Sequence, residues 1–257
     1  MITGIFGPPR VGKTSLMVYL LTLIAFDFER TAKMQKAIRE RNLLDGINRT
    51  IPDHTASANF EITFKKLGYR DRYARVIDPK RLAFAEPGTK PHFLLPWQAI
   101  GIMEAQQFFN SRKFAEFSAS QSNVFEQHGH LHLDFYLDTQ RPGLIDLNIR
   151  ELMNFIEVRN MKINNNKDGF FESVAWTVRE FANIGLVDEY MKSGKQDSSL
   201  YVEKLITSAV DVRTQYNSWS LEDRFYEGHE KEDYDLFYKM QDLKDAKKYL
   251  EDIKAVA

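Results

Sequence analysis

The sequence predicts an α/β fold in which a mostly parallel central sheet is flanked by helices. The chain opens with an apolar strand at residues 2–6, which runs through a glycine-containing loop into an apolar helical stretch at residues 16–26. Further strand-like segments alternate with helix-like segments, as expected where helical crossovers join parallel strands. A length of 257 residues is enough for one large α/β domain or for one domain with an appendage.

The loop after the first strand matches the pattern G-x-x-x-x-G-K-[ST] at every fixed position. Its residues are Gly7, Pro8, Pro9, Arg10, Val11, Gly12, Lys13, Thr14 and the following Ser15. Such a loop surrounds a polyphosphate with backbone N–H groups, and the positive end of the next helix dipole adds to the attraction. The sequence therefore predicts a P-loop that binds ATP, with Lys13 on the β and γ phosphates and Thr14 on Mg²⁺. The alternative is a glycine-rich turn that merely opens a core helix.

The composition excludes several classes of site. The net charge is −1, from 35 basic and 36 acidic residues, so a nucleic-acid partner would need a local basic patch. The chain has no cysteine, which excludes disulfides, thiolate zinc sites and cysteine nucleophiles and favours an intracellular protein. The longest apolar run, residues 16–26, is shorter than the roughly 20 residues that cross a membrane. We therefore expect no membrane-spanning segment in this chain.

The remaining elements are predicted from periodicity and turn residues. In the first half, a helix at 27–44 continues the first helix and ends near Gly46, and strands follow at 58–64 and 75–77. After a turn at 86–88, a strand within 97–106 reaches Glu104, and helical pieces then extend to residue 127. In the second half the predicted elements are a strand at 131–137, a short helix at 146–152, strands at 154–158 and 171–178 joined as an antiparallel hairpin by a turn at 164–169, and an amphipathic helix from residue 224 to the end.

Several of these segments together resemble one protein family. They are residues 7–14, 57–60 (Ser-Ala-Asn-Phe), 102–106 (Ile-Met-Glu-Ala-Gln), 129–142 (from Gly-His-Leu-His-Leu-Asp to Thr-Gln-Arg-Pro) and 145–150 (Ile-Asp-Leu-Asn-Ile-Arg). In order and spacing they are similar to the zonula occludens toxin (Zot) family, P-loop ATPases of phage assembly that are similar in fold to the FtsK/HerA group of DNA-translocating motors. The resemblance covers roughly residues 1–180, which we predict to be the ATPase domain. Residues 181–257 are predicted to be a partly helical, charged C-terminal extension.

The resemblance implies a RecA-like sheet and the roles of several residues. Glu104 corresponds to the catalytic glutamate that polarises the attacking water, and Gln140 to the polar residue that senses the γ-phosphate. A ring-shaped homo-oligomer such as a hexamer is implied, in which an arginine reaches the nucleotide of the neighbouring subunit. Arg150 is the first candidate for that arginine, ahead of Arg141 and Arg159, although each could equally be a surface ion-pair residue. The implied partners are phage coat or assembly proteins or phage DNA, and the implied location is the host cytoplasm or the inner face of its membrane.

One position departs from the family pattern. The family has an Mg²⁺-anchoring aspartate immediately before the glutamate, whereas this chain has Met103, whose thioether does not suit a hard cation. Either Thr14 and the phosphates suffice, or Asp138 substitutes, or hydrolysis is slow. Met103 therefore keeps a nucleotide-binding scaffold without turnover as an alternative to an assembly ATPase. A DNA-packaging or conjugative translocase, which would show DNA-stimulated ATPase activity, is a further alternative. A small-molecule kinase is disfavoured, because no arginine-rich lid follows the P-loop at short range.

Two further features allow both a structural and a functional interpretation. His128, His130 and His132 would share one face of a strand and could bind a metal, but they could equally be polar residues at a strand edge. The basic segment 65–81, which contains Tyr69 and Tyr73, could follow a phosphate backbone or could be a solvated loop.

Overall fold

The computed structural model describes residues 1–46, 50–82, 94–111 and 119–216. Its strands are β1 (Ile2–Phe6), β2 (Ala56–Ala58), β3 (Thr63–Phe64), β4 (Arg72–Tyr73), β5 (Arg75–Val76), β6 (Ala99–Ile102), β7 (Asp134–Thr139), β8 (Asn154–Asn165), β9 (Phe171–Phe181) and β10 (Val202–Ser208). Its helices are α1 (Lys13–Ala25), α2 (Phe28–Asp45), α3 (Ala119–Glu126), α4 (Leu147–Arg150) and α5 (Ile184–Lys192). Among the described helices, none combines the length and the apolar character that crossing a bilayer requires.

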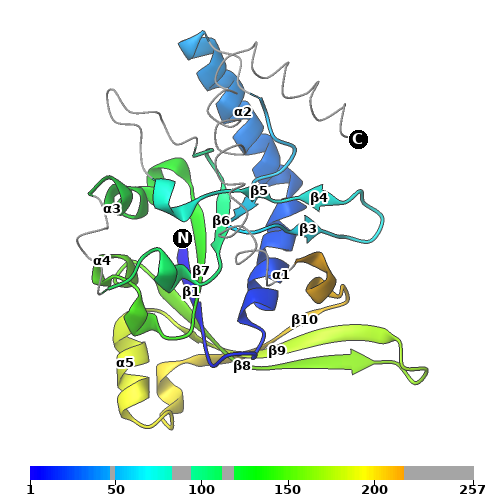
Figure 1. Cartoon of the computed structure of the whole chain (residues 1–257), viewed down its shortest axis with the longest axis vertical. Helices are drawn as coiled ribbons and strands as arrows, with labels where there is room; N and C mark the ends of the chain where they lie inside the picture. The colour runs from blue at the N-terminus through cyan, green and yellow to red at the C-terminus, as the bar shows by residue number, and fades with distance from the viewer. Residues whose placement is uncertain (47–49, 83–93, 112–118, 217–257) are drawn as a thin grey trace.

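All strands except β3 and β4 form one sheet, in the order β10-β9-β8-β1-β7-β6-β2-β5 (Figure 1). The strands from β8 to β5 in this order run parallel, whereas β9 is antiparallel to β8 and to β10. The predicted α/β class with a mostly parallel sheet is therefore confirmed. Because β7 lies between β1 and β6, the carboxyl ends of these three strands meet at one edge of the sheet, where ligands bind in open α/β sheets.

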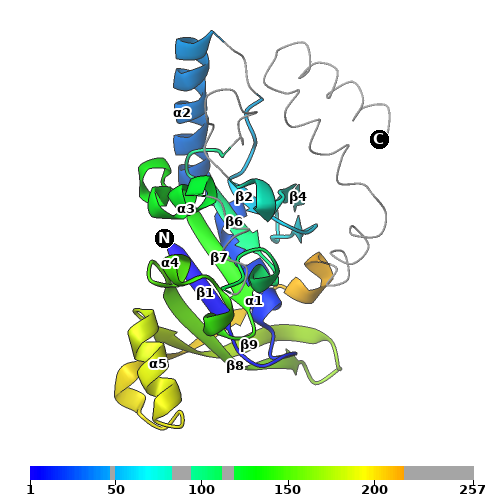
Figure 2. The same ribbon diagram turned by 60° about the vertical axis from the view of Figure 1, so that its left-hand side comes forward.

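Helices cover both faces of the sheet, and each face has its own apolar core (Figure 2). On one face Leu16, Met17 and Leu21 of α1 are fully buried in a cluster that also contains Trp176 of β9. On the other face α3, α4 and α5 contribute to a second cluster around Phe135. The strand β1 is buried along its whole length because both clusters and two neighbouring strands enclose it.

The predicted continuation of the first helix is a separate helix. Asp27 interrupts the helical run with an extended backbone, and its side chain accepts a hydrogen bond from the Arg30 N–H at 2.9 Å, which begins α2. Helix-forming residues on both sides hid this break from sequence analysis. The helix ends as predicted, with Gly46 in the left-handed region at φ 65°.

Two predicted strands are displaced. The strand expected at 58–64 is divided into β2 and β3, and Asn59 lies directly after β2. The strand expected at 131–137 begins only at Asp134, because residues 128–131 form a 3₁₀ turn that ends with His132 at φ 53°. The hairpin of β8 and β9 is confirmed, and it is longer than predicted, so that it extends from the body as a two-stranded arm (Figure 1).

The segment after residue 180 belongs in part to the same fold. β10 pairs with β9, and Val212 lies fully buried in the core between α1 and the sheet. The predicted boundary at residue 180 thus falls inside the sheet, and neither α5 nor β10 was predicted. The predicted turn at 86–88 and the predicted helix from residue 224 lie outside the described residues.

Candidate nucleotide-binding site

The loop between β1 and α1 needs glycine at both conserved positions. Gly7 has φ 147° and Gly12 has φ 90°, which side-chain-bearing residues rarely adopt. A Cβ atom on Gly7 would lie 2.6 Å from the Val158 carbonyl oxygen, and one on Gly12 would lie 2.6 Å from the Met161 sulfur. The loop is therefore pressed against β8, and this strand forms a wall of the site that the sequence did not reveal.

The first turn of α1 is left open to an anion. The helix begins at Lys13 without a side-chain cap and without an acidic residue in its first turn. Its hydrogen-bond ladder starts where the Leu16 N–H donates to the Gly12 carbonyl at 2.9 Å, so the preceding N–H groups have no helical acceptor. The Lys13 ammonium is buried and donates to the Pro8 carbonyl at 3.1 Å, which holds its charge over the loop. Together these groups form an anion-binding turn.

Asp138 lies directly against the P-loop. The Thr14 hydroxyl donates to Asp138 Oδ2 at 2.6 Å, and the Asp138 side chain is buried. Burial raises the pKa of Asp138 to about 6, against the opposing effects of the Thr14 hydrogen bond and the Lys13 charge, and with a further contribution from the charge of Glu104. Its second oxygen, Oδ1, is buried and has no hydrogen-bond partner among the residues that the structure describes. The Thr14 hydroxyl and this carboxylate are oxygen donors of the kind that Mg²⁺ and its bound waters prefer.

Glu104 lies just beyond β6, at the same edge of the sheet. Its backbone has φ 52° and ψ 46°, a left-handed conformation that costs a side-chain-bearing residue roughly 1–2 kcal/mol. The side chain is half-buried and accepts a hydrogen bond from the Gln106 amide. Ile102 at the end of β6 pairs with Leu137 of β7, the residue before Asp138, so the chain positions of Glu104 and Asp138 are neighbours across the two strands. The structure therefore brings Lys13, Thr14, Asp138 and Glu104 together.

Met103 occupies the position where the family pattern has an aspartate. Its side chain is 4% exposed and belongs to the apolar cluster on the α1 face of the sheet. At position 103 the family pattern has an aspartate that could supply an oxygen ligand, whereas this chain has a methionine that packs in the core. The carboxylate nearest to the Thr14 hydroxyl comes instead from β7, at Asp138.

The other predicted residues are placed less closely. Gln140 directly follows β7, whose residue Thr139 pairs with Phe6 at the start of the P-loop, and its side chain is exposed. Arg150 is the last residue of α4, and β8 begins shortly after it, opposite Thr3 near the start of β1. Arg150 therefore lies toward the amino-terminal ends of these parallel strands, whereas the P-loop of the same chain lies at their carboxyl ends. Its Nε is buried without a hydrogen-bond partner among the described residues.

Arg141 and Arg159 are the two remaining arginine candidates. Within the described part of the chain, neither of them contacts the P-loop. Arg141 is exposed, and Arg159 pairs with the buried Glu157 at 3.3 Å.

Two residues near the C-terminal end of the described chain reach the P-loop helix. The Tyr216 hydroxyl lies 2.9 Å from the Ser15 hydroxyl, and the Thr22 hydroxyl donates to the Gln215 amide oxygen at 3.1 Å. Burial raises the pKa of Tyr216, so its hydroxyl stays protonated at neutral pH. No local motif marks this role, because the contact joins residues that are far apart in the sequence.

The three histidines do not gather around a metal position. His132 stacks on Trp97 with ring centroids 4.0 Å apart, and His128 hydrogen-bonds to the Phe125 carbonyl. Within the described residues, no group of three metal-ligating side chains is present. Residues 128–131 form a 3₁₀ turn instead of a strand, so the three rings do not share the face of a strand.

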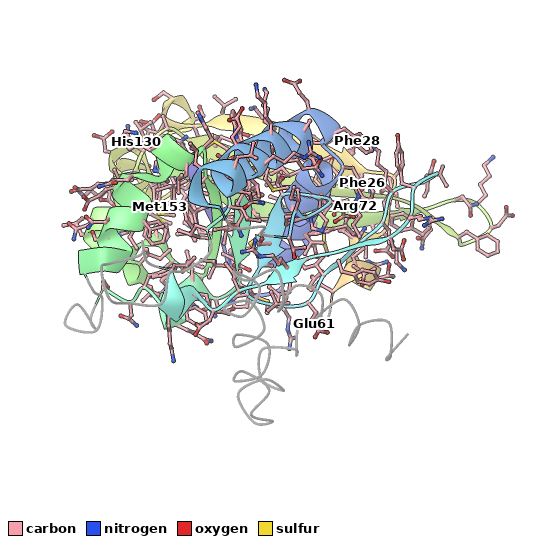
Figure 3. The ribbon with its side chains drawn as sticks, turned by 90° about the horizontal axis from the view of Figure 1, so that it is seen from above. Phe26, Phe28, Glu61, Arg72, His130 and Met153 are labelled. Atoms are coloured by element: carbon pink, nitrogen blue, oxygen red, sulfur yellow. The ribbon has the colours of Figure 1, made fainter. Side chains whose placement is uncertain are left out.

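Part of the basic segment is engaged within the chain. The Arg72 guanidinium lies 5.0 Å from the ring centre of Phe26 and 5.2 Å from that of Phe28, and it donates to the Ala25 carbonyl (Figure 3). The Lys66 ammonium lies 5.6 Å from the ring centre of Phe26. These cations fasten the hairpin of β3 and β4 to the junction of α1 and α2, so they have a structural function.

The solved structures to which this chain is similar share little sequence identity with it. The N-terminal domain of zonular occludens toxin from Neisseria meningitidis is 20% identical, with a TM-score of 0.46 over 84% of this chain and 98% of that chain. The genome packaging NTPase B204 from Sulfolobus turreted icosahedral virus 2, in complex with ATP-gammaS, is 12% identical, with a TM-score of 0.37 over 83% and 93%. The DNA-packaging ATPase B204 from Sulfolobus Turreted Icosahedral Virus is 13% identical, with a TM-score of 0.37 over 83% and 93%. No family model and no curated protein sequence matches the chain.

Proposed function

We propose that this chain is a phage ATPase that binds and hydrolyses ATP to drive virion assembly and export or the transfer of phage DNA. The observation that carries the proposal is the convergence of four groups at one edge of the sheet. Lys13 and Thr14 begin α1, Asp138 accepts a hydrogen bond from Thr14 at 2.6 Å, and Glu104 follows the neighbouring strand β6. This combination supplies phosphate binding, a cation position and a base, which phosphoryl transfer to water requires.

Each group has a distinct role in the proposed reaction. The loop amides and Lys13 bind the phosphates and offset their charge. Mg²⁺, when bound beside Thr14 and Asp138, supplies further charge stabilisation on the phosphate oxygens. Glu104 orients the attacking water and accepts its proton, and Gln140 responds to the presence of the γ-phosphate. Arg150 would act on the nucleotide of a neighbouring subunit in a ring located in the host cytoplasm or at the inner face of the membrane.

The proposed Mg²⁺ position differs from the family pattern in its source strand. Asp138 of β7 takes the role that the aspartate before Glu104 would have, and Met103 serves the core instead. Within the described part of the chain Asp138 Oδ1 has no hydrogen-bond partner, which supports this exchange, because a buried carboxylate oxygen without a partner is costly unless a ligand satisfies it.

Two other functions stay open to experiment. A nucleotide-binding scaffold without turnover is favoured by the burial of Met103, which leaves only one carboxylate in contact with Thr14 among the described residues. A DNA-packaging or conjugative translocase uses the same site, and it is distinguished by stimulation of the ATPase by DNA.

Phosphate release, measured with and without Mg²⁺ and with and without DNA, tests the proposal. We expect Mg²⁺-dependent release by the wild type and a loss of roughly a hundredfold in Lys13→Ala, because a preorganised charge on the transferred group is removed. Lys36→Ala is the matched control, since Lys36 is exposed on α2 away from the P-loop. Equal rates in the two variants would contradict the proposal. ATP binding without release by the wild type would favour the scaffold.

A further inference from the structure

The backbone of Met103 is bound on both sides by one buried side chain. The Asn59 amide nitrogen donates to the Met103 carbonyl at 3.1 Å, and the Met103 N–H donates to the Asn59 amide oxygen at 2.8 Å. Asn59 itself is 3% exposed, so water does not compete for these bonds. Its own N–H donates to the Gly101 carbonyl at 3.1 Å, which continues the pairing of β2 with β6.

This pair of hydrogen bonds ends the strand at a defined point. The last backbone pair of the β2–β6 ladder is Ala58 with Gly101, and beyond it the side chain of Asn59 replaces the missing strand. Met103 is thereby held in the plane of the sheet with its own side chain in the core. The next residue must leave the strand, and Glu104 does so in the left-handed conformation at φ 52°.

A left-handed conformation at a residue other than glycine persists only where its surroundings impose it, and such residues cluster at functional sites. On one side Glu104 is followed by the 3₁₀ turn of residues 105–107, in which the Gln107 N–H donates to the Glu104 carbonyl at 2.8 Å. On the other side the constraint comes from the Asn59–Met103 pair. Both constraints act on the Glu104 backbone, at the end of the sheet that holds Thr14 and Asp138, because Ile102 of β6 pairs with Leu137 of β7.

We propose that Asn59 is a positioning residue that holds the Glu104 carboxylate at the P-loop by binding both backbone polar groups of Met103. The inference rests on the proposed ATPase function. Asparagine is suited to this position because its amide offers one donor and one acceptor side by side, whereas aspartate lacks the donor and alanine lacks both.

Steady-state phosphate release by Asn59→Ala and Asn59→Asp tests the role. We expect kcat to fall by about tenfold to a hundredfold, since a small misplacement of a reacting group has an effect of this size. KM and the affinity for ATP should stay within about twofold, because Lys13 and Thr14 are untouched. Asn59→Asp keeps the shape of the side chain, so it reports on the donor even where the alanine variant fails to fold. Asn164→Ala is the control, because its amide bonds Ser173 at 3.0 Å on the arm.

A double-variant cycle with Glu104→Gln separates positioning from a general loss of stability. If Asn59 acts through Glu104, adding Asn59→Ala to Glu104→Gln should lower single-turnover hydrolysis no further. An additional fall of the same size in that background, a change confined to KM, or an unchanged kcat would overturn the inference.

A spectroscopic readout keeps the inference testable if the wild type does not turn over ATP. In that case the proposed function fails, while NMR backbone chemical shifts of Glu104 still report whether its conformation depends on Asn59. We expect these shifts to move in Asn59→Ala and to stay unchanged in Asn164→Ala. Unchanged shifts in both variants would overturn the role of Asn59.

Discussion

Asp138 combines two properties that oppose each other. A carboxylate at a cation site has to be charged, yet Asp138 is buried, and burial raises its pKa from 3.8 to about 6. The folded chain therefore binds the proton of this carboxyl group more tightly than the unfolded chain does. The stabilisation that the protonated form provides is fully present below the ordinary pKa, and it is lost as the pH rises through about 6.

We predict that Asp138→Asn removes this pH dependence. The wild type should lose stability between pH 5 and pH 8, because its buried carboxylate becomes charged, while the neutral amide does not change. The free energy of unfolding from urea titrations at the two pH values measures the effect. The difference in unfolding free energy, variant minus wild type, should be more positive at pH 8 than at pH 5. An equal difference at both values would show that Asp138 does not titrate in this range.

The same substitution should have the opposite effect on activity. We predict that Asp138→Asn lowers Mg²⁺-dependent phosphate release by at least about tenfold, because the charged oxygen beside Thr14 is lost. It should also raise the Mg²⁺ concentration that gives half-maximal release. In the wild type kcat/KM should increase with pH through about 6. Asp168→Asn, at the exposed tip of the arm, is the control, and equal activity of the two variants would contradict the metal role.

At the scale of elements, the contact between α1 and the 3₁₀ turn η7 (Val212–Gln215) joins the P-loop helix to the end of the described chain. Tyr216, directly after this turn, forms an isolated bridge with Ile62 and packs edge-on against Phe60. Its hydroxyl reaches Ser15 at 2.9 Å. Tyr216, in the C-terminal part of the fold, thus contacts both the P-loop helix and the segment after β2.

We predict that Tyr216→Phe lowers the free energy of unfolding by about 1 kcal/mol, because one partly buried hydrogen bond is removed while the ring stays in place. Chemical denaturation measures the loss. Tyr73→Phe is the matched control, since the Tyr73 side chain is 69% exposed. A similar loss in both variants, or none in Tyr216→Phe, would show that the Ser15 contact does not stabilise the fold.

At the scale of the whole molecule, the sheet does not end where the family resemblance ends. β10 covers the outer edge of β9, and Val212 fills the core against α1. A fragment that stops at residue 180 would expose the edge of β9 and leave part of the α1 core open. Both changes favour aggregation.

We predict that the fragment 1–180 does not fold cooperatively, whereas the fragment 1–216 unfolds in a single transition. Circular dichroism during heating, together with size-exclusion chromatography, distinguishes the two outcomes. A cooperative transition of the fragment 1–180 near that of the fragment 1–216 would instead support residue 180 as a domain boundary.

The sequence by itself determined the P-loop and the class of the fold. The strand at 2–6, the loop at 7–14 and the hairpin of β8 and β9 follow from local patterns, because strand alternation, glycine spacing and turn residues are written within a few neighbouring positions. Glu104 was found from the sequence through family resemblance. The break at Asp27 was missed because helix-forming residues continue on both sides of it, and the start of β7 was missed because the apolar alternation at 131–137 begins before the strand does.

Only the tertiary structure decided which side chains meet at the site. Asp138 contacts Thr14 because β7 lies beside β1, Met161 supports Gly12 because β8 lies on the other side, and Asn59 binds Met103 because β2 pairs with β6. Strand order sets each of these contacts, and it joins residues separated by tens to more than a hundred positions. Local periodicity records which face a residue occupies, whereas the neighbour across the sheet depends on the packing of the whole chain.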